Sequence, residues 1–109
     1  MRKLRRGKFG NIKTVCGAGE EHHSKKEAAR CDELHLMQDG GLIQTLSAHP
    51  QPDFKLEVKG TKVCKYVADF TYWERGKFVV EDVKGRRTAV YNLKKKLMSA
   101  IHGISIRET

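Results

Sequence analysis

The feature that most constrains the fold is a pair of β-rich runs joined by a tight turn. Residues 63–73 and 77–84 are rich in Val, Phe, Tyr and Trp, and an Arg-Gly pair lies between them as a two-residue hairpin loop. A loop of two residues, or one of four residues over positions 74–77, gives the register that pairs Asp69 of the first strand with Asp82 of the second. A three-residue loop would shift the register by one residue, so the prediction depends on the turn.

The rest of the chain predicts a helix before and a helix after the strands. One helical window runs from residue 24 to about residue 38 and ends at two glycines, and a second runs from Thr88 to Gly103 on an apolar stripe that starts at Val90. Residues 54–59 alternate as a half-exposed strand, and residues 104–106 predict a last strand that a helical crossover can add in parallel. The predicted class is α/β (α+β), with an αβββαβ order and a mixed sheet flanked by helices.

Charge is segregated along the chain. The sequence has 22 Lys and Arg against 13 Asp and Glu, a formal net charge of +9. Nearly all the acids lie between two basic flanks, residues 1–14 and 84–96, which contain no Asp or Glu. Residues 1–23 lack periodicity and predict a basic arm and loop, whereas residues 24–109 predict a single domain. Basic flanks attract phosphate backbones, although they can also serve only to keep a small protein soluble. The expected nucleic-acid contacts are Arg2, Lys3, Arg5, Arg6, Lys8, Lys13, Arg86, Arg87 and Lys95.

Acidic and basic side chains meet on one face of the predicted hairpin. Asp82 and Lys84 are two residues apart and share the face of Asp69, while Glu81 points to the other side. Two carboxylates held this close repel each other unless a cation lies between them, and a hard divalent cation such as Mg²⁺ takes oxygen ligands. A neighbouring lysine can orient the attacking water or help to deprotonate it. The pattern therefore predicts metal-assisted hydrolysis of a phosphodiester.

Two short segments resemble a nuclease signature. Residues 66–70 read Tyr-Val-Ala-Asp-Phe and residues 79–85 read Val-Val-Glu-Asp-Val-Lys-Gly, which together resemble the PD-(D/E)xK signature. By this resemblance Asp69 is the first acid, and Asp82-Val83-Lys84 is the acid-x-lysine element. The chain departs from the signature in two ways, because alanine replaces the proline before Asp69 and the second acid is the less usual Asp.

Further segments are similar to a family of small, mostly uncharacterised phage and prophage proteins that is grouped with these nucleases. They are Asn11-Ile12-Lys13-Thr14, Ser24-Lys25-Lys26-Glu27-Ala28, Gln51-Pro52 and Tyr91-Asn92-Leu93-Lys94-Lys95-Lys96-Leu97. This resemblance covers residues from about 10 to 106 and implies the αβββαβ core of the superfamily. It also implies that Glu27, Asp69, Asp82 and Val83 hold Mg²⁺ or Mn²⁺, and that Lys84 serves the nucleophilic water.

Two of the candidate residues also have simpler interpretations. Glu27 stands three residues after Ser24 and can cap its own helix, but it also falls on the inward stripe with Cys31 and Leu34. Lys94 is the lysine of the second helix that is best directed towards the site, as a phosphate or water contact. Alternatively, Lys94 belongs to a run of charged side chains that only faces the solvent.

The function expected from the sequence is a Mg²⁺- or Mn²⁺-dependent DNA endonuclease that uses Glu27, Asp69, Asp82, Lys84 and Lys94. The sequence shows no separate module for reading bases, which favours recognition of DNA shape, such as a branch. A Holliday-junction resolvase that acts as a homodimer is one specific form of this hypothesis. Two rival hypotheses are a non-catalytic nucleic-acid-binding module, in which the acids are structural, and a phage interaction or inhibitor protein.

Composition also bears on the setting of the protein and on two other kinds of site. Three irregularly spaced cysteines make no disulfide framework, and no apolar run is long enough for a membrane span, so we expect a cytoplasmic protein. The resemblance to phage and prophage proteins implies that this cytoplasm is that of a bacterium or a phage-infected cell. Cys31 and His35 are four residues apart, but no zinc-ligand spacing accompanies them. Trp73, near the hairpin turn, is a candidate for stacking on bases, although aromatic residues in strands more often pack in the core.

Overall fold

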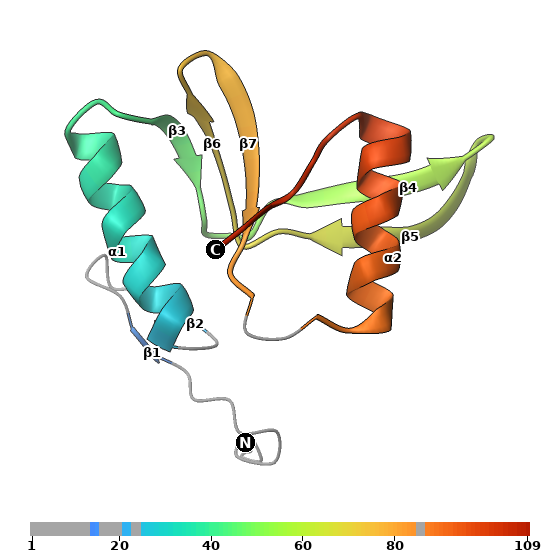
Figure 1. The fold of residues 1–109 in the computed structure, drawn as a ribbon, viewed down its shortest axis with the longest axis horizontal. Helices are drawn as coiled ribbons and strands as arrows, with labels where there is room; N and C mark the ends of the chain where they lie inside the picture. Colours follow the sequence, from blue (N-terminus) through green and yellow to red (C-terminus); the bar gives the residue numbers. More distant parts are fainter. Residues whose placement is uncertain (1–13, 16–20, 23–24, 85–86) are drawn as a thin grey trace.

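A four-stranded mixed sheet forms the centre of the protein. The computed structural model describes residues 14–15, 21–22, 25–84 and 87–109. The strand order in this sheet is β3-β6-β7-β8, and only the β7–β8 pair is parallel (Figure 1). The four strands are β3 (Gln44–Ser47), β6 (Phe70–Glu74), β7 (Lys77–Asp82) and β8 (Arg107–Glu108). The predicted mixed sheet, with a last strand added in parallel, is confirmed. The predicted order of three strands between the two helices is wrong, because five strands lie between them in the described part of the chain.

The β6–β7 hairpin has the predicted register. Phe70 pairs with Glu81 at one end of the ladder, and Glu74 pairs with Lys77 at the other. Both loop residues have positive φ, 52° at Arg75 and 75° at Gly76, which is the backbone of a two-residue loop that matches the twist of the strands. One step beyond the Phe70–Glu81 pair, the chain brings Asp69 opposite Asp82.

The run predicted as one strand over residues 63–73 is two strands in different sheets. β5 (Thr61–Val67) pairs antiparallel with β4 (Asp53–Val58) in a separate two-stranded sheet, and β6 starts only at Phe70. Ala68 lies at the bend between them, where its small side chain is fully buried and its N–H donates to the Pro52 carbonyl at 2.9 Å. The composition of the run does not reveal this bend, because the residues on both sides of it favour strands.

Two apolar clusters lie on opposite faces of the β6–β7 hairpin. The first cluster joins α1 (Lys25–Asp39) to one face, and it contains Ala28, Cys31, Leu34, Ile43, Ala48, Phe70, Tyr72 and Val79. The second joins α2 (Ala89–Leu97) and the β4–β5 pair to the other face, and it contains Leu56, Tyr66, Ala68, Val80, Tyr91, Met98 and Ile106. In Figure 1 α1 therefore stands on one side of the hairpin, and α2 crosses β4 and β5 on the other.

The second helix begins and ends as predicted but turns a partly different face inwards. The Thr88 side chain accepts the Tyr91 N–H at 3.1 Å as an N-cap, and the helix continues through the π-helical turn η2 (Met98–His102) to Gly103, which has φ 68°. The predicted stripe is confirmed in its second half, where Leu97 and Ile101 pack against the second cluster. Its first half is wrong, because Val90 is 62% exposed, whereas Tyr91 is buried. Tyr91 takes the inward position because its ring packs in the second cluster while its hydroxyl reaches Glu108.

The two ends of the chain complete the fold. β1 (Thr14–Val15) and β2 (Glu21–His22) form a short antiparallel pair beside α1, within the segment predicted as an arm and loop. The last strand lies at Arg107–Glu108, three residues later than the predicted 104–106, because Ile106 packs into the second cluster before the chain joins β7. Neither α1 nor α2 is long and apolar enough to cross a membrane.

Candidate active site

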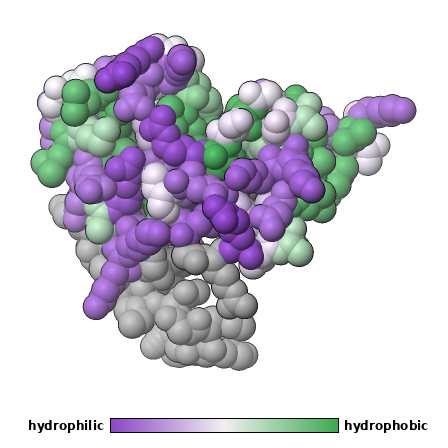
Figure 2. Space-filling model, viewed as in Figure 1, coloured by the Kyte–Doolittle hydropathy of each residue, from purple (hydrophilic) through white to green (hydrophobic). Residues whose placement is uncertain are grey.

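Side chains from four parts of the chain line one open cavity of about 360 Å³. The β5–β6 bend supplies Asp69, the end of β7 supplies Asp82, and Lys84 follows two residues later. The loop before β4 adds Gln51, and α2 adds Lys94. On the face of the molecule seen in Figure 1, hydrophilic residues gather across the middle, between α1 and α2 (Figure 2).

Asp69 is held from both sides. The Gln51 Nε2 donates to its Oδ1 at 3.1 Å, and the Val83 N–H donates to its Oδ2 at 2.8 Å. Burial, together with the neighbouring Asp82 carboxylate, raises the pKa of Asp69 to about 8, against a lowering effect of the Val83 N–H. Asp69 and Asp82 therefore repel each other when both are ionised.

Asp82 is the more buried of the two carboxylates, with 5% exposure. The Tyr66 hydroxyl donates to its Oδ2, and the Lys84 Nζ lies 3.4 Å from its Oδ1. Burial and the bond to Asp82 raise the pKa of Tyr66 well above its ordinary value, so the hydroxyl keeps its proton and remains a donor. Tyr66 thereby fixes the direction in which Asp82 points.

Lys84 is placed between a carboxylate and an aromatic ring. Its Nζ lies 3.8 Å from the centroid of the Tyr91 ring, in a cation–π contact, and its side chain is 22% exposed. These contacts hold the ammonium beside Asp82 and leave part of it open to the cavity. Lys94 lines the same cavity from the next turn of α2. The structure thus brings together the Asp69, Asp82, Lys84 and Lys94 of the sequence prediction.

Glu27 lies close to this group but on α1. It is 6% exposed and shares the inward face of the helix with Cys31 and Leu34, as the stripe predicted. Its charge contributes to the raised pKa of Asp69, and its neighbour Lys26 donates to the Lys84 carbonyl at 3.0 Å, which ties the first turn of α1 to the site. The alternative role of Glu27 as a helix cap depends on Ser24, which lies outside the described residues.

The donor set fits a hard divalent cation. Asp69 and Asp82 offer carboxylate oxygens only, and a cation between them would remove their mutual repulsion. In the described part of the chain, no group of three or more His, Cys, Asp and Glu side chains is arranged to hold a metal ion. Mg²⁺ does not require three protein ligands, because it is usually bound by one or two carboxylates and completes its coordination shell with water and substrate phosphate. Asp69 and Asp82 would therefore hold the ion, with the Val83 N–H donating to Asp69.

The last strand supports the segment that carries Asp82 and Lys84. The Thr109 N–H donates to the Asp82 carbonyl at 3.1 Å, and the Lys84 N–H donates to the Thr109 carbonyl at 3.0 Å. On the other face of β7, the buried Glu81 accepts hydrogen bonds from Arg30 of α1 and from the Thr109 hydroxyl. Backbone and side-chain bonds therefore fix this segment on both sides of the strand.

The predicted phosphate-binding residues are only partly described. Arg87 and Lys95 both bond the Glu108 carboxylate, so two cations share one anion on the surface. Those contacts lower the pKa of Glu108 to about 2, the Arg87 hydrogen bond being the largest cause. The remaining predicted contacts lie outside the described residues, and they are Arg2, Lys3, Arg5, Arg6, Lys8, Lys13 and Arg86.

Sequence reasoning missed two tyrosines at the site. Tyr66 belongs to the alternating inward positions of β5, which signals burial, but its bond to Asp82 depends on how the β4–β5 pair meets β7. Tyr91 lies in a segment that was quoted for its resemblance, yet the predicted inward stripe of α2 left it out. Neither contact can be deduced from spacing along the chain.

Comparison with known proteins identifies a family for this chain but no individual protein that matches it. Neither the curated proteins nor the solved structures include a significant match to this chain. One family model, described as a protein of unknown function, matches residues 6–105, a span that contains every side chain of the site. Because the match covers most of the sequence, the chain belongs to the DUF1064 family.

Proposed function

We propose that the protein is a Mg²⁺- or Mn²⁺-dependent nuclease of the PD-(D/E)xK type that hydrolyses phosphodiester bonds in DNA. The observation that carries the proposal is the meeting of Asp69 and Asp82 across the end of one hairpin, with the Lys84 amine 3.4 Å from Asp82 in the same cavity. Two carboxylates and an amine in one open cavity are the groups needed to hold a cation and to position a water molecule beside a phosphate.

Each residue has a separate part in the reaction. A bound Mg²⁺ or Mn²⁺ would supply Lewis-acid activation of the phosphodiester. Lys84 donates a hydrogen bond that orients the attacking water and offsets the charge that develops on phosphorus, and Lys94 contacts a neighbouring phosphate. Gln51 and Tyr66 hold the two carboxylates in place. The water gives up one proton to the solvent as its oxygen bonds to phosphorus, the bond from phosphorus to the leaving oxygen breaks, and that oxygen takes up a proton, so that no proton is gained or lost overall.

DNA is the proposed substrate because the protein is strongly basic. A net charge of +9 on 109 residues favours a polyanion, and the basic flanks lie on either side of the segment that builds the site. The small size of the chain leaves little surface for reading base sequence, so we propose recognition of DNA shape, with branched DNA as one candidate. Action in the cytoplasm of a bacterium or phage-infected cell, and as a homodimer on a symmetric branch, are parts of the same proposal.

The test is DNA cleavage by the wild-type protein and by matched variants. Supercoiled plasmid, linear duplex and a four-way junction are incubated with Mg²⁺, with Mn²⁺ or with EDTA. We expect cleavage with either metal and none with EDTA. Asp82→Asn and Lys84→Ala should lower the cleavage rate by at least about 100-fold, because each removes a group at the reacting centre. Asp53→Asn and Lys62→Ala change exposed residues of β4 and β5 and should retain the wild-type rate.

Three results would contradict the proposal. Cleavage that persists in EDTA or in Asp82→Asn would show that another site or a contaminant is responsible. Salt-sensitive DNA binding without cleavage under any metal condition would favour the non-catalytic binding module. Absence of both binding and cleavage at low salt would favour the interaction-protein hypothesis.

A further inference from the structure

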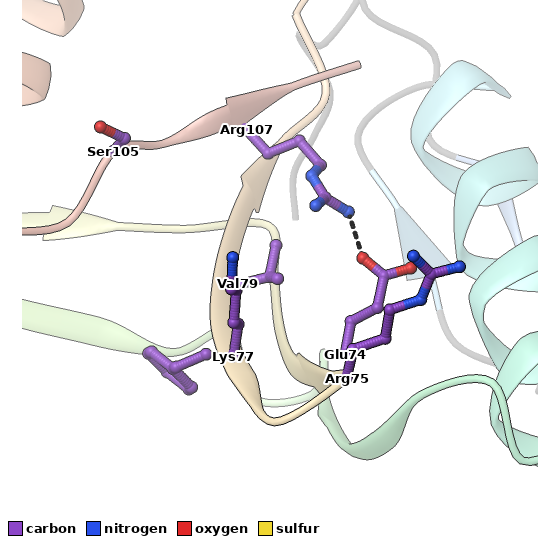
Figure 3. A pocket seen from close by; sticks show the side chains of 7 residues that line it. Glu74, Arg75, Lys77, Val79, Ser105 and Arg107 are labelled. Atoms are coloured by element: carbon purple, nitrogen blue, oxygen red, sulfur yellow. Dashed lines mark hydrogen bonds and ion pairs between the residues drawn. The ribbon is translucent and has the colours of Figure 1, made fainter.

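Two cavities lie along the β8 edge of the central sheet, and both are lined by Ser105. Each measures about 470 Å³. The first lies at the turn of the β6–β7 hairpin, where Arg75 and Lys77 line it together with Arg107 of β8. Figure 3 shows Ser105 and Arg107 on one stretch of chain, with Lys77 on the neighbouring strand. Because the two cavities share a residue, they adjoin each other along this edge.

The second cavity lies against α2 and the π-helical turn that follows it. Four of its five lining residues come from that helical segment at positions i, i+3, i+4 and i+7, so they share one face. The full lining is Asn92, Lys95, Lys96, Ser99 and Ser105. Each of these side chains carries a hydrogen-bond donor, and none is acidic. Side chains of lysine, asparagine and serine are donors that proteins use to hold phosphate.

The cations of the two cavities outnumber the acids. Among the described residues, Glu74 is the one acid that lines either cavity, and it bonds Arg107 at 2.9 Å, so this pair has no net charge. Lys95 bonds Glu108 at 3.0 Å, and Glu108 also binds Arg87, so one carboxylate is shared by two cations. Three further cations are exposed and bond no carboxylate in the part of the chain that the structure describes, and they are Arg75, Lys77 and Lys96. The edge is therefore positively charged along both cavities.

The edge leads away from the candidate active site towards the hairpin turn. Asp82 pairs with Glu108 across the parallel β7–β8 ladder, and Ser105 precedes Glu108 by three residues in the direction of the turn. Lys77 and Asp82, the two ends of β7, are separated by about 17 Å at about 3.3 Å per residue. They project to opposite faces of the sheet, so a ligand that reaches both cavities passes around the sheet edge rather than along the face of Asp82. About five base pairs of a duplex, at about 3.4 Å each, cover this distance.

We infer that this edge is a second binding surface, the basic trough, which holds the backbone of a DNA duplex several base pairs from the cleaved bond. Its residues are Arg75, Lys77, Lys95, Lys96 and Ser105. Cations spread over two adjoining cavities suit an anion whose charges repeat along its length, whereas a single small anion fills only one cavity. A second copy of this chain fits poorly, because two such edges bring like charges together. The inference rests on the proposed function in one respect, which is that it takes DNA as the ligand.

Binding of a fluorescein-labelled duplex of about 24 base pairs, followed by anisotropy in EDTA at several NaCl concentrations, tests the basic trough. The double variant Lys77→Gln/Lys96→Gln removes one exposed cation from each cavity. Each phosphate contact contributes about 0.9 to the slope of log K against log salt, so we expect the slope of the double variant to be smaller than that of wild type by about 2. Lys59→Gln/Lys62→Gln removes the same charge from exposed positions near the β4–β5 turn and should retain the wild-type slope.

A negative charge at the centre of the trough separates attraction of phosphate from other effects. Ser105 is exposed and lines both cavities, so Ser105→Asp places a carboxylate where the two meet. We expect at least about tenfold weaker duplex binding by Ser105→Asp, because a like charge beside a phosphate repels it. Ser105→Ala removes only a hydroxyl and should weaken binding less. A circular dichroism spectrum equal to that of wild type shows that each variant remains folded.

The outcomes distinguish this inference from the proposed function. A slope that is unchanged in Lys77→Gln/Lys96→Gln, or that falls equally in Lys59→Gln/Lys62→Gln, would overturn the basic trough. So would binding of phosphatidylglycerol vesicles, lost in Lys77→Gln/Lys96→Gln, by a protein that does not bind the duplex. A smaller slope of Lys77→Gln/Lys96→Gln in EDTA, combined with no cleavage by wild type in Mg²⁺, would uphold the trough and contradict the nuclease. Cleavage by wild type, together with an unchanged slope in Lys77→Gln/Lys96→Gln, would contradict the trough alone.

Discussion

Hydrogen bonds to Asp69 and Asp82 hold two like charges together at the proposed metal site. Gln51 and the Val83 N–H act on Asp69, while Tyr66 and Lys84 act on Asp82. The register of the hairpin was predictable from the Arg-Gly loop, and so was the approach of the two acids. The supporting donors were not, because Gln51 and Tyr66 lie elsewhere in the sequence and reach the acids only through tertiary contacts.

Removing the Tyr66 hydroxyl should weaken metal binding without unfolding the protein. Tyr66→Phe keeps the buried ring but leaves Asp82 without the donor that orients it. Supporting bonds of this kind change metal affinity or activity by about 10- to 100-fold, so we expect losses of that size in Mn²⁺ affinity and cleavage rate. Tyr91→Phe is the control, because its hydroxyl bonds Glu108 and its ring under Lys84 is retained. Equal effects of the two substitutions would argue against a positioning role for Tyr66.

Glu81 is a structural acid on the opposite face of β7 from Asp82. It is fully buried and accepts hydrogen bonds from Arg30, Tyr72 and Thr109. Burial alone would raise the pKa of Glu81, but these donors outweigh it and hold the pKa below its ordinary value of 4.5. In the unfolded chain the pKa returns to that ordinary value. Stability from Glu81 is therefore complete above it and is lost as the pH falls through the lower folded-state pKa.

Glu81→Gln should lower the free energy of unfolding at pH 7 by about 3 kcal/mol, because it leaves the Arg30 charge without its buried partner. The difference from wild type should be constant from pH 7 down to the ordinary pKa of 4.5, and should narrow at lower pH, where the Glu81 carboxyl of the unfolded chain takes up a proton. Urea unfolding across this range measures both effects. Glu33→Gln removes the exposed partner of Arg30 and should cost less than about 1 kcal/mol. A Glu81→Gln deficit that is the same at every pH would show that the carboxylate charge is not what stabilises α1 on the sheet.

At the scale of elements, local signals predicted best. The capping residue and apolar spacing placed α1 and the start of α2 correctly, and the Arg-Gly loop fixed the β6–β7 register. Features that depend on contacts between distant parts of the chain were less predictable. The bend at Ala68 sends β5 and β6 into different sheets, and the inward face of α2 follows Tyr91 rather than Val90. Both depend on which surface lies opposite, and a single sequence does not contain that information.

The backbone conformation of Arg75 in the hairpin loop lowers the stability of the protein, and a substitution can relieve this strain. Arg75 has φ 52°, a left-handed conformation that Asn adopts more readily than Arg. Arg75→Asn should therefore stabilise the protein by roughly 0.5–1 kcal/mol. Thermal unfolding measures the effect. The expected result is a higher unfolding midpoint, and a lower midpoint would show that the Arg75 side chain stabilises the loop.

In the whole molecule, the site lies where three structural parts meet. The β6–β7 hairpin brings Asp82 to the cavity, α2 brings Lys94, and the charge of Glu27 on α1 acts on Asp69, while each helix packs in its own apolar cluster. The hairpin belongs to both clusters, so loss of either one would displace carboxylates of the site. Composition and charge predicted an α/β protein with basic flanks, but they did not predict that the core divides into two clusters on opposite faces of one hairpin.

Mn²⁺ binding, followed through the electron paramagnetic resonance signal of the free ion, tests directly whether Asp69 and Asp82 share a divalent cation. We predict one bound ion per chain for the wild-type protein, and at least about tenfold weaker binding for Asp69→Asn and for Asp82→Asn. Asp53→Asn, which changes an exposed carboxylate on β4, should bind like wild type. Equal Mn²⁺ affinity in all four proteins, or no binding by the wild type at millimolar Mn²⁺, would contradict the account.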